Sequence, residues 1–194
     1  MTKNLTEQQR RQLLDLAREA IKARLLENKL LQVDLESLPP PLQAERACFV
    51  TLTKGGKLRG CVGCLEAVQP LALEVRDRAL GAAFQDYRFP NLRESELDQV
   101  RIEISYLTPP RSLQYPTPTE LPGLLRPGID GVVLSDGGRR ATFLPQVWQK
   151  LPDPEQFLDR LCLKMGRQPG LWRDRMLDVQ VYQVEKFSEG DSTS

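Results

Sequence analysis

The chain has 194 residues, of which 40% are hydrophobic and 27% are charged, and its formal net charge is +1. This composition is ordinary for a globular protein, and the near-neutral charge gives no general reason to expect a nucleic acid or an anionic membrane as partner. The sequence contains no histidine. Histidine-based triads, Cys–His dyads and histidine metal ligands are therefore excluded, and a general base would have to be a carboxylate, a lysine, a tyrosine or water.

Cysteine use and hydropathy together predict the compartment. The cysteines are Cys48, Cys61, Cys64 and Cys162, too few for a disulfide scaffold in a chain of this length. No apolar run approaches the length of a membrane span, and the polar segment 1–11 lacks the apolar core of a signal peptide. We therefore expect a cytoplasmic protein with free thiols, long enough for one well-buried domain.

The first half of the chain is predicted to place a β-hairpin between two helices. Thr6 and Gln9 resemble a capping box, and apolar residues then repeat at helical spacing. Gly55 and Gly56 are typical of a hairpin turn. In chain order we predict a helix over 6–28, an extended connector at the prolines 39–41, strands over 47–53 and 57–62, and a helix over 70–85.

The second half is predicted to be richer in strands. Ile102, Ile104 and Tyr106 alternate with polar residues, which indicates a half-buried strand. In chain order we predict that strand over 100–107, an irregular proline-rich segment over 108–128, a hairpin of strands 132–135 and 140–144, a helix over 154–165 capped by Gly166, a strand over 179–187 and a polar tail over 188–194. Hairpins interleaved with helices indicate an α+β fold with a mainly antiparallel sheet flanked by helices.

The residues most suggestive of chemistry lie in the segment 57–64, Lys-Leu-Arg-Gly-Cys-Val-Gly-Cys. Because alternate residues of a strand share a face, Arg59, Cys61 and Gly63 are expected to point the same way. A guanidinium beside a thiol favours the reactive thiolate, and glycines such as Gly60 allow a ligand or another backbone to approach closely. This is the construction of a site, without a named reaction.

The same segment resembles the Leu-Arg-Gly-Cys-Ile-Gly signature of the AMMECR family, and other motifs of that family follow in order. They are Asp-Tyr-Arg-Phe-Pro at 86–90, Ile-Ser-Tyr-Leu-Thr-Pro at 104–109, Gly-Ile-Asp-Gly-Val at 128–132 with Phe-Leu-Pro-Gln-Val at 143–147, and Leu-Cys-Leu-Lys-Met-Gly at 161–166. The match extends from the first helix to about Phe187. Cys64 departs from the family pattern, so a Cys-x-x-Cys role would belong to this protein rather than to its relatives.

The resemblance implies one α+β domain over 1–187, with a larger and a smaller lobe and a cleft near the signature at 58–63. Bacterial and archaeal members often accompany a Memo-like protein and a radical-SAM protein, under the label AmmeMemoRadiSam system, so these are the partners that the resemblance implies. It brings no established reaction, and it leaves the cofactor unknown.

Each candidate residue also has a structural interpretation. Cys61 is either a nucleophile assisted by Arg59 or a packed thiol whose neighbour Arg59 pairs with a carboxylate. Asp86 and Arg88 either bind an anion and handle protons beside Cys61 or form a helix-terminating ion pair, with the following phenylalanine as a core plug. Lys164 lies on an apolar helix, where its amine is either partly desolvated with a lowered pKa or extended to solvent.

The pair Cys61 and Cys64 is interpreted as coincidental. Thioredoxin-type chemistry places Cys-x-x-Cys at a helix amino terminus, whereas the next predicted helix begins only at Pro70. A four-cysteine zinc site would need Cys48 and Cys162, which are separately spaced single residues. No metal site is predicted.

Two hypotheses of different classes follow. The first is an enzyme or enzyme component acting on a small anionic or carbonyl-bearing substrate, with candidate catalytic residues Cys61, Arg59, Asp86 and Lys164 and candidate ligand-binding residues Gly60, Gly63 and Arg88. The second is a non-catalytic binding or adaptor module that docks a ligand or a protein partner in the same cleft. A nucleic-acid role is disfavoured by the neutral net charge, and a steep salt dependence of RNA binding would revive it.

Overall fold

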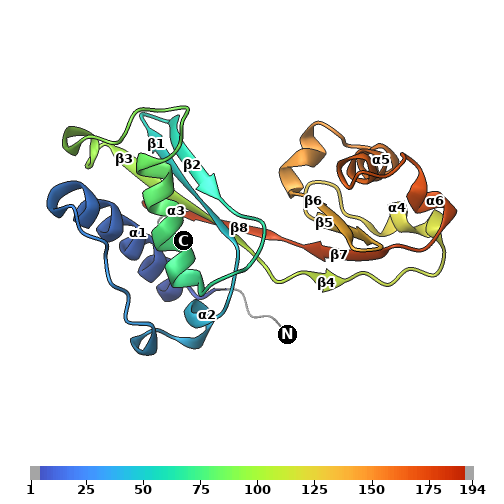
Figure 1. Ribbon diagram of the computed structural model, residues 1–194, viewed down its shortest axis with the longest axis horizontal. Coiled ribbons are helices and arrows are strands. Elements are labelled where there is room, and N and C mark those ends of the chain that lie inside the picture. Colours follow the sequence, from blue (N-terminus) through green and yellow to red (C-terminus); the bar gives the residue numbers. More distant parts are fainter. Residues whose placement is uncertain (1–4, 191–194) are drawn as a thin grey trace. The chain divides into compact units, whose positions relative to one another are not determined.

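The computed structural model describes residues 5–190 and divides the chain into two compact units (Figure 1). Unit 1 consists of the described residues up to Leu107 and from Glu185 onward, and unit 2 consists of Thr108–Val184. The chain therefore enters unit 2 once and returns once, so that its last strand completes unit 1. Each unit has its own cluster of buried hydrophobic residues.

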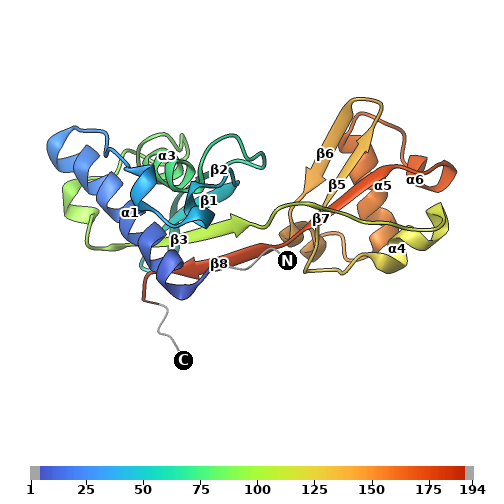
Figure 2. The same cartoon turned by 90° about the horizontal axis from the view of Figure 1, so that it is seen from below.

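Unit 1 is a four-stranded sheet covered by two long helices. The strand order is β2-β1-β3-β8, with β1 at Cys48–Lys54, β2 at Lys57–Gly63, β3 at Val100–Leu107 and β8 at Val184–Ser188. β1 pairs antiparallel with both of its neighbours, and β3 lies beside β8 (Figures 1 and 2). The helices are α1 (Glu7–Glu27) and α3 (Leu71–Phe84), and the short elements are η1 (Leu35–Ser37), α2 (Pro40–Gln43) and η2 (Glu94–Glu96).

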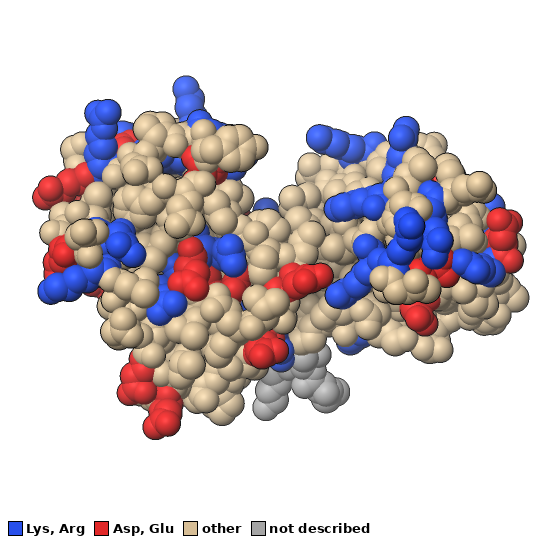
Figure 3. All heavy atoms as spheres, viewed as in Figure 1, with Lys and Arg blue, Asp and Glu red and all other residues tan. Residues whose placement is uncertain are grey.

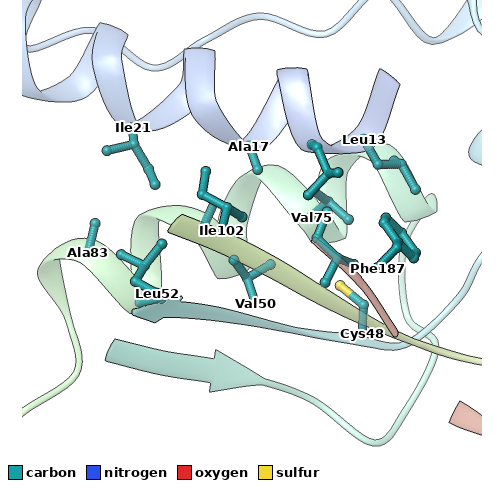
Figure 4. Packing of buried hydrophobic residues seen from close by; sticks show 14 of the residues in the cluster. Leu13, Ala17, Ile21, Cys48, Val50, Leu52, Val75, Ala83, Ile102 and Phe187 are labelled. Carbon is teal, nitrogen blue, oxygen red and sulfur yellow. The ribbon is translucent and has the colours of Figure 1, made fainter. Parts of the chain in front are cut away.

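The core of unit 1 lies between one face of the sheet and the two helices. Figure 4 shows side chains of both helices directed toward the strands: Leu13, Ala17 and Ile21 from α1, and Val75 and Ala83 from α3, against Val50, Leu52 and Ile102. All of these are essentially inaccessible to water. Burial of such branched apolar side chains is the main favourable contribution to folding, at about 25 cal/mol for each Å² removed from water.

Unit 2 contains a second four-stranded sheet, in the order β4-β7-β5-β6. Its strands are β4 (Arg111–Ser112), β5 (Gly131–Asp136), β6 (Arg139–Phe143) and β7 (Asp178–Tyr182), and its helices are η3 (Pro118–Glu120), α4 (Leu121–Leu124), η4 (Pro145–Gln149), α5 (Pro154–Lys164) and α6 (Leu171–Asp174). Its core is centred on Phe157 of α5. The Phe157 ring stacks on Trp148 at 3.7 Å between centroids and meets Phe143 edge-on at 5.3 Å.

The predicted α+β class, with antiparallel sheets and flanking helices, is confirmed. The first helix is also confirmed in detail, because Thr6 accepts from the Gln9 amide and the Gln9 side chain accepts from the Thr6 amide, forming the predicted capping box. Asn28 ends that helix in the left-handed conformation, at φ 51°. Among the described residues, no helix is long and apolar enough to cross a membrane.

Three predictions about local structure were wrong. Prolines 39–41 do not form an extended connector, because Pro40 begins the short helix α2, a position at which a missing N–H costs nothing. The strand predicted over 179–187 is two strands, β7 and β8, which join different sheets on either side of Gln183. The segment 108–128 is not wholly irregular, since it contains β4, η3 and α4.

The hairpin of β1 and β2 contains a bulge at the signature. Leu52 pairs with Gly60 and Thr53 pairs with Leu58, so Arg59 is an extra residue on β2 without an opposite partner. Gly60 then lies directly against α3, where an added Cβ would come within 2.1 Å of the Ala82 carbonyl oxygen. A glycine at 60 is therefore required for β2 to pack against this helix.

We predict that Gly60→Ala destabilises the protein by about 2 kcal/mol or more, because the new methyl group forces β2 and α3 apart. Chemical denaturation followed by circular dichroism measures the change. Gly123→Ala is the matched control, since a Cβ at that helical position meets nothing within 4 Å. An unchanged denaturation midpoint for Gly60→Ala would contradict the proposed packing constraint.

Candidate functional site

Cys61 lies on β2, an edge strand of the unit 1 sheet, with its side chain on the face opposite α3. Val62 faces α3, where its side chain lies against Gly81, and the neighbouring Cys61 points the other way. Across the sheet Cys61 is paired with Thr51, whose hydroxyl lies 3.3 Å from the Cys61 Sγ. The thiol is half-buried, so it has both a neighbouring polar group and access to solvent.

The outer edge of β2 is held by Asp86 and Arg88, which follow α3. The Cys61 amide donates to Asp86 Oδ2 at 2.8 Å, and Arg88 Nη2 donates to the Cys61 carbonyl at 3.3 Å. Asp86 and Arg88 also form an ion pair, with Arg88 Nη2 at 2.7 Å from Asp86 Oδ2. These two side chains thus occupy the backbone groups of Cys61 that a further strand would use.

Arg88 determines the protonation of Asp86. Hydrogen bonds from the Arg88 guanidinium, helped by the Cys61 and Arg88 amides, outweigh the effect of burial and hold the pKa of Asp86 well below its usual range. The carboxylate is therefore ionised at all ordinary pH values and is a weak proton acceptor. The helix-terminating ion pair expected as the alternative is present, but Phe89 is only partly buried and does not belong to the core.

Arg59 is buried and paired with a carboxylate. Its Nε and Nη2 donate to the two oxygens of Glu96 at 3.1 and 2.9 Å, and Lys54 donates to the same carboxylate at 3.0 Å. The Arg59 guanidinium, followed by other donors including Lys54, lowers the pKa of Glu96 to about 2. Arg59 Nη1 is buried and finds no hydrogen-bond partner among the described residues.

This pairing changes the expected relation between Arg59 and Cys61. Simple alternation along β2 predicts that both side chains share a face, but the bulge makes Arg59 an unpaired residue whose donors are turned to Glu96 and the Asn91 carbonyl. Two of its nitrogens are therefore committed to structural bonds. Orienting a substrate through them would require breaking a buried ion pair, which is costly.

Cys64 belongs to a different group of residues from Cys61. Its Sγ lies 2.9 Å from Glu74 Oε1 and 2.9 Å from the Glu66 carbonyl. Glu74 is fully buried on α3 and also accepts from Arg78 Nε at 2.6 Å and Gln69 Nε2 at 2.7 Å. The two cysteines of the Cys-x-x-Cys segment thus have separate partners.

Burial and charge keep the Cys64 thiol protonated. Burial, with the hydrogen bond to Glu74, raises the pKa of Cys64 to about 11. Burial alone would raise the pKa of Glu74, but hydrogen bonds from Cys64, Arg78 and Gln69 outweigh it and leave that pKa below its usual value. Burial also raises the pKa of Cys48 and of Cys162. Within residues 5–190, no set of three or more cysteine or acidic side chains is placed to hold a metal ion.

The remaining predicted residues lie as follows. Lys164 is in unit 2, exposed, with its Nζ donating to the Thr142 carbonyl at 2.9 Å and lying 5.1 Å from the centre of the Phe143 ring. At Gly63 an added Cβ would come within 2.3 Å of the Phe49 ring, so the chain's own atoms fill the space beside Gly63, as they do beside Gly60. Unit 1 therefore brings together Cys61, Asp86 and Arg88, whereas Lys164 lies in the other unit.

Several exposed apolar side chains lie within or close in sequence to the signature at 58–63. Tyr87, between the two residues that bind the Cys61 backbone, is 97% exposed. Leu58 on β2 is 45% exposed, and Leu65 and Val68 in the segment after β2 are 36% and 65% exposed. Isolated exposed apolar residues are common in folded proteins, and larger exposed apolar patches mark interaction sites.

Sequence reasoning missed Glu96, Glu74 and Thr51. Glu74 carried a usable signal, because it lies three residues after Leu71 and next to Val75 on the buried face of α3. An acidic residue on an apolar helix face needs a partner, and Arg78 stands one turn later. Glu96 carried none, since its contact with Arg59 spans 37 residues and depends on the tertiary fold.

Comparison with known proteins identifies relatives over nearly the whole chain. Residues 14–187 match the AMMECR1 family. A protein of Methanothermobacter thermautotrophicus is 38% identical over 95% of this chain and 96% of its own length, and one of Thermofilum pendens is 38% identical over 91% and 88%. The crystal structure of an uncharacterised Pyrococcus horikoshii protein is similar, with a TM-score of 0.68 and 34% identity, covering 92% of this chain and 90% of that one.

We predict that Asp86→Asn lowers the free energy of unfolding at pH 7 by about 2 kcal/mol, because the ion pair with Arg88 is lost. The folded-state pKa of Asp86 lies below the unfolded value, so its stabilisation is present above about pH 4 and is lost as the pH falls toward the folded pKa. The difference between wild type and variant should therefore close in acid.

Denaturation midpoints measured between pH 7 and pH 2 provide the test. Asp98→Asn, a change at an exposed carboxylate, is the control and should follow the wild-type curve. A constant difference between Asp86→Asn and wild type across this pH range would show that the Asp86 carboxylate has no depressed pKa.

Proposed function

Because the chain belongs to the AMMECR1 family, we propose that it is a binding module that docks a protein partner along the signature strand and the adjoining Asp86–Arg88 turn. The observation that carries the proposal is Tyr87, which is 97% exposed while its two neighbours are anchored to Cys61. Tyrosine is enriched among the residues that dominate binding energy at protein interfaces.

The anchoring supports a contact role for Tyr87. Asp86 accepts from the amides of Cys61 and Arg88, and the Phe89 amide donates to the Asp86 carbonyl at 3.0 Å, so the turn is closed on both sides of the tyrosine. A rigid turn loses little conformational entropy on binding, and this preserves affinity. Leu58 lies on β2, and Leu65 and Val68 lie in the segment that follows it; we propose that their exposed side chains extend the docking surface.

The chemistry near Cys61 argues for binding over catalysis. Asp86, which accepts from the Cys61 amide, is paired with Arg88, and its lowered pKa makes it a poor general base. Arg59 is committed to Glu96. Neither Asp86 nor Arg59 is therefore placed as a free proton carrier for an attack by Cys61.

The second candidate is an enzyme or enzyme component that acts on a small anionic or carbonyl-bearing substrate through Cys61. It is favoured by the half-buried sulfur, whose neighbour is the Thr51 hydroxyl, and by Arg88, whose side chain is 45% exposed. In this candidate Arg88 would orient the substrate, while Cys61 would attack or contact it. No cofactor is assigned to either candidate.

The partners that we propose for the binding module are a Memo-like protein and a radical-SAM protein, as in the bacterial AmmeMemoRadiSam system. A cytoplasmic location is part of the same proposal, and the four free cysteines, two of them fully buried, are consistent with a reducing compartment. The resemblance of the signature, together with the exposed apolar side chains around it, supports this choice.

We predict that Tyr87→Ala weakens binding to the purified Memo-like or radical-SAM protein of the same organism by at least about tenfold, as for a central interface aromatic. Isothermal titration calorimetry measures the affinity. Ile129→Ala, which truncates a 49% exposed side chain of unit 2, is the matched control and should bind as wild type. Binding that survives Tyr87→Ala unchanged, or no binding of wild type to either protein, would contradict the proposed docking surface.

Alkylation by iodoacetamide, resolved by mass spectrometry, separates the two candidates. The binding module predicts that Cys61 reacts at pH 7 no faster than a free cysteine thiol. Cys48 and Cys162 are fully buried and Cys64 has a pKa of about 11, so these serve as internal controls that remain unmodified. Alkylation of Cys61 already near its maximal rate at pH 7 would favour the enzyme, and Cys61→Ser would then abolish activity rather than leave binding intact.

A further inference from the structure

Unit 2 presents a cationic surface that the proposed docking of unit 1 does not use. This surface, the basic face of unit 2, is formed by Arg139, Arg160, Lys164, Arg167 and Arg175. Arg167 is partly exposed and the other four are exposed. Figure 3 shows Lys and Arg side chains gathered over the part of unit 2 that Figure 1 labels α5 and α6. The neutral net charge of the whole chain therefore conceals a local excess of positive charge.

Two guanidinium groups of this face share a single carboxylate. Arg167 Nε lies 2.8 Å and Arg175 Nη2 lies 2.6 Å from the same oxygen of Asp136, at the β5–β6 turn. The Asp136 side chain is only 12% exposed, so both cations converge on a nearly buried anion. Asp136 thus provides one negative charge for two guanidinium groups.

Interactions with the carboxyl-terminal end of α5 explain some of the cations of the basic face but not all of them. Arg139 Nη1 donates to the Gly166 carbonyl at 2.9 Å, and Lys164 lies in the last turn of α5, where cations interact favourably with the helix dipole. Arg160 lies one turn earlier, beyond that influence. The second guanidinium at Asp136 is likewise not needed for capping.

The exposed face of α5 combines charge with an apolar side chain. Arg160, Leu163 and Lys164 are spaced i, i+3, i+4 and so share one side of the helix, and Leu163 is 46% exposed. Nearer the start of α5 the charge changes, because Arg173 binds both Glu155 and Asp159 at 2.8 Å. The positive excess is thus confined to the carboxyl-terminal half of α5 and the adjoining turn.

We propose that the basic face of unit 2 binds an acidic segment of a partner protein that also carries apolar side chains. Guanidinium groups pair bidentately with carboxylates, and those held in place by Asp136 and Gly166 lose little freedom on doing so. Leu163 would contact apolar residues of such a segment. Single-stranded nucleic acid is the less suitable occupant, because its bases stack on aromatic rings and unit 2 has no exposed aromatic side chain within its described residues.

The test uses three fluorescent probes with the full-length protein: a peptide of repeated Glu-Glu-Leu, a peptide of repeated Glu-Glu-Gly with the same length and charge, and an oligouridylate of matched charge. We expect the Glu-Glu-Leu peptide to bind more tightly than both others in fluorescence anisotropy. Arg160→Gln with Lys164→Gln should weaken it by about tenfold. Leu163→Gln should weaken the Glu-Glu-Leu peptide alone.

Lys150→Gln with Arg111→Gln is the matched control, since it removes two exposed cations of unit 2 outside the basic face. This control should bind like wild type, and circular dichroism should show both double variants folded. Equal weakening by the control would reveal attraction without a defined site and overturn the proposal. Tighter binding of the oligouridylate than of the Glu-Glu-Leu peptide would show that the basic face prefers a nucleic acid, and it would overturn the proposal. Failure of the Glu-Glu-Leu peptide to bind would also overturn the proposal.

Discussion

The close approach of β2 to α3 is the constraint on which the candidate site depends. Gly60 has no side chain, and the Ala82 carbonyl occupies the place where a Cβ would lie, at 2.1 Å. This contact fixes the edge strand against the helix, and the helix end then places Asp86 and Arg88 beside the Cys61 backbone. The glycine of the signature thus acts through packing, and the position of the thiol is one of its consequences.

The same packing explains why Arg59 leaves the regular alternation of β2. Pairing of Gly60 with Leu52 and of Leu58 with Thr53 leaves one residue over, and that residue is Arg59. Its guanidinium is buried, and a buried charge is tolerated only when it is paired and hydrogen-bonded. Glu96 provides the pairing, with Lys54 as a second cation on the same carboxylate. An arginine that the sequence suggests as a catalytic residue thus forms a buried ion pair within unit 1.

The limits of sequence reasoning follow from the range of the interactions. The first helix could be predicted from Thr6 and Gln9 because a capping box is a local device, and alternation over eight residues was enough for β3. The division of the last predicted strand at Gln183 could not be predicted from the sequence. The segments of β7 and β8 are equally strand-like and differ only in the sheets that they join. The partners of Arg59 and Cys64 depend in the same way on which elements the fold brings together.

The net charge of the whole chain does not reveal the local charge on the surface of unit 2. Unit 2 carries ten Lys and Arg against eight Asp and Glu, a small excess, yet two of its guanidinium groups share the Asp136 carboxylate. Electrostatic attraction in salt solution reaches only about 8 Å, so a partner responds to the charges within that distance and not to the net charge of the chain. A neutral protein can therefore present a cationic surface on one unit and an apolar, tyrosine-bearing edge on the other.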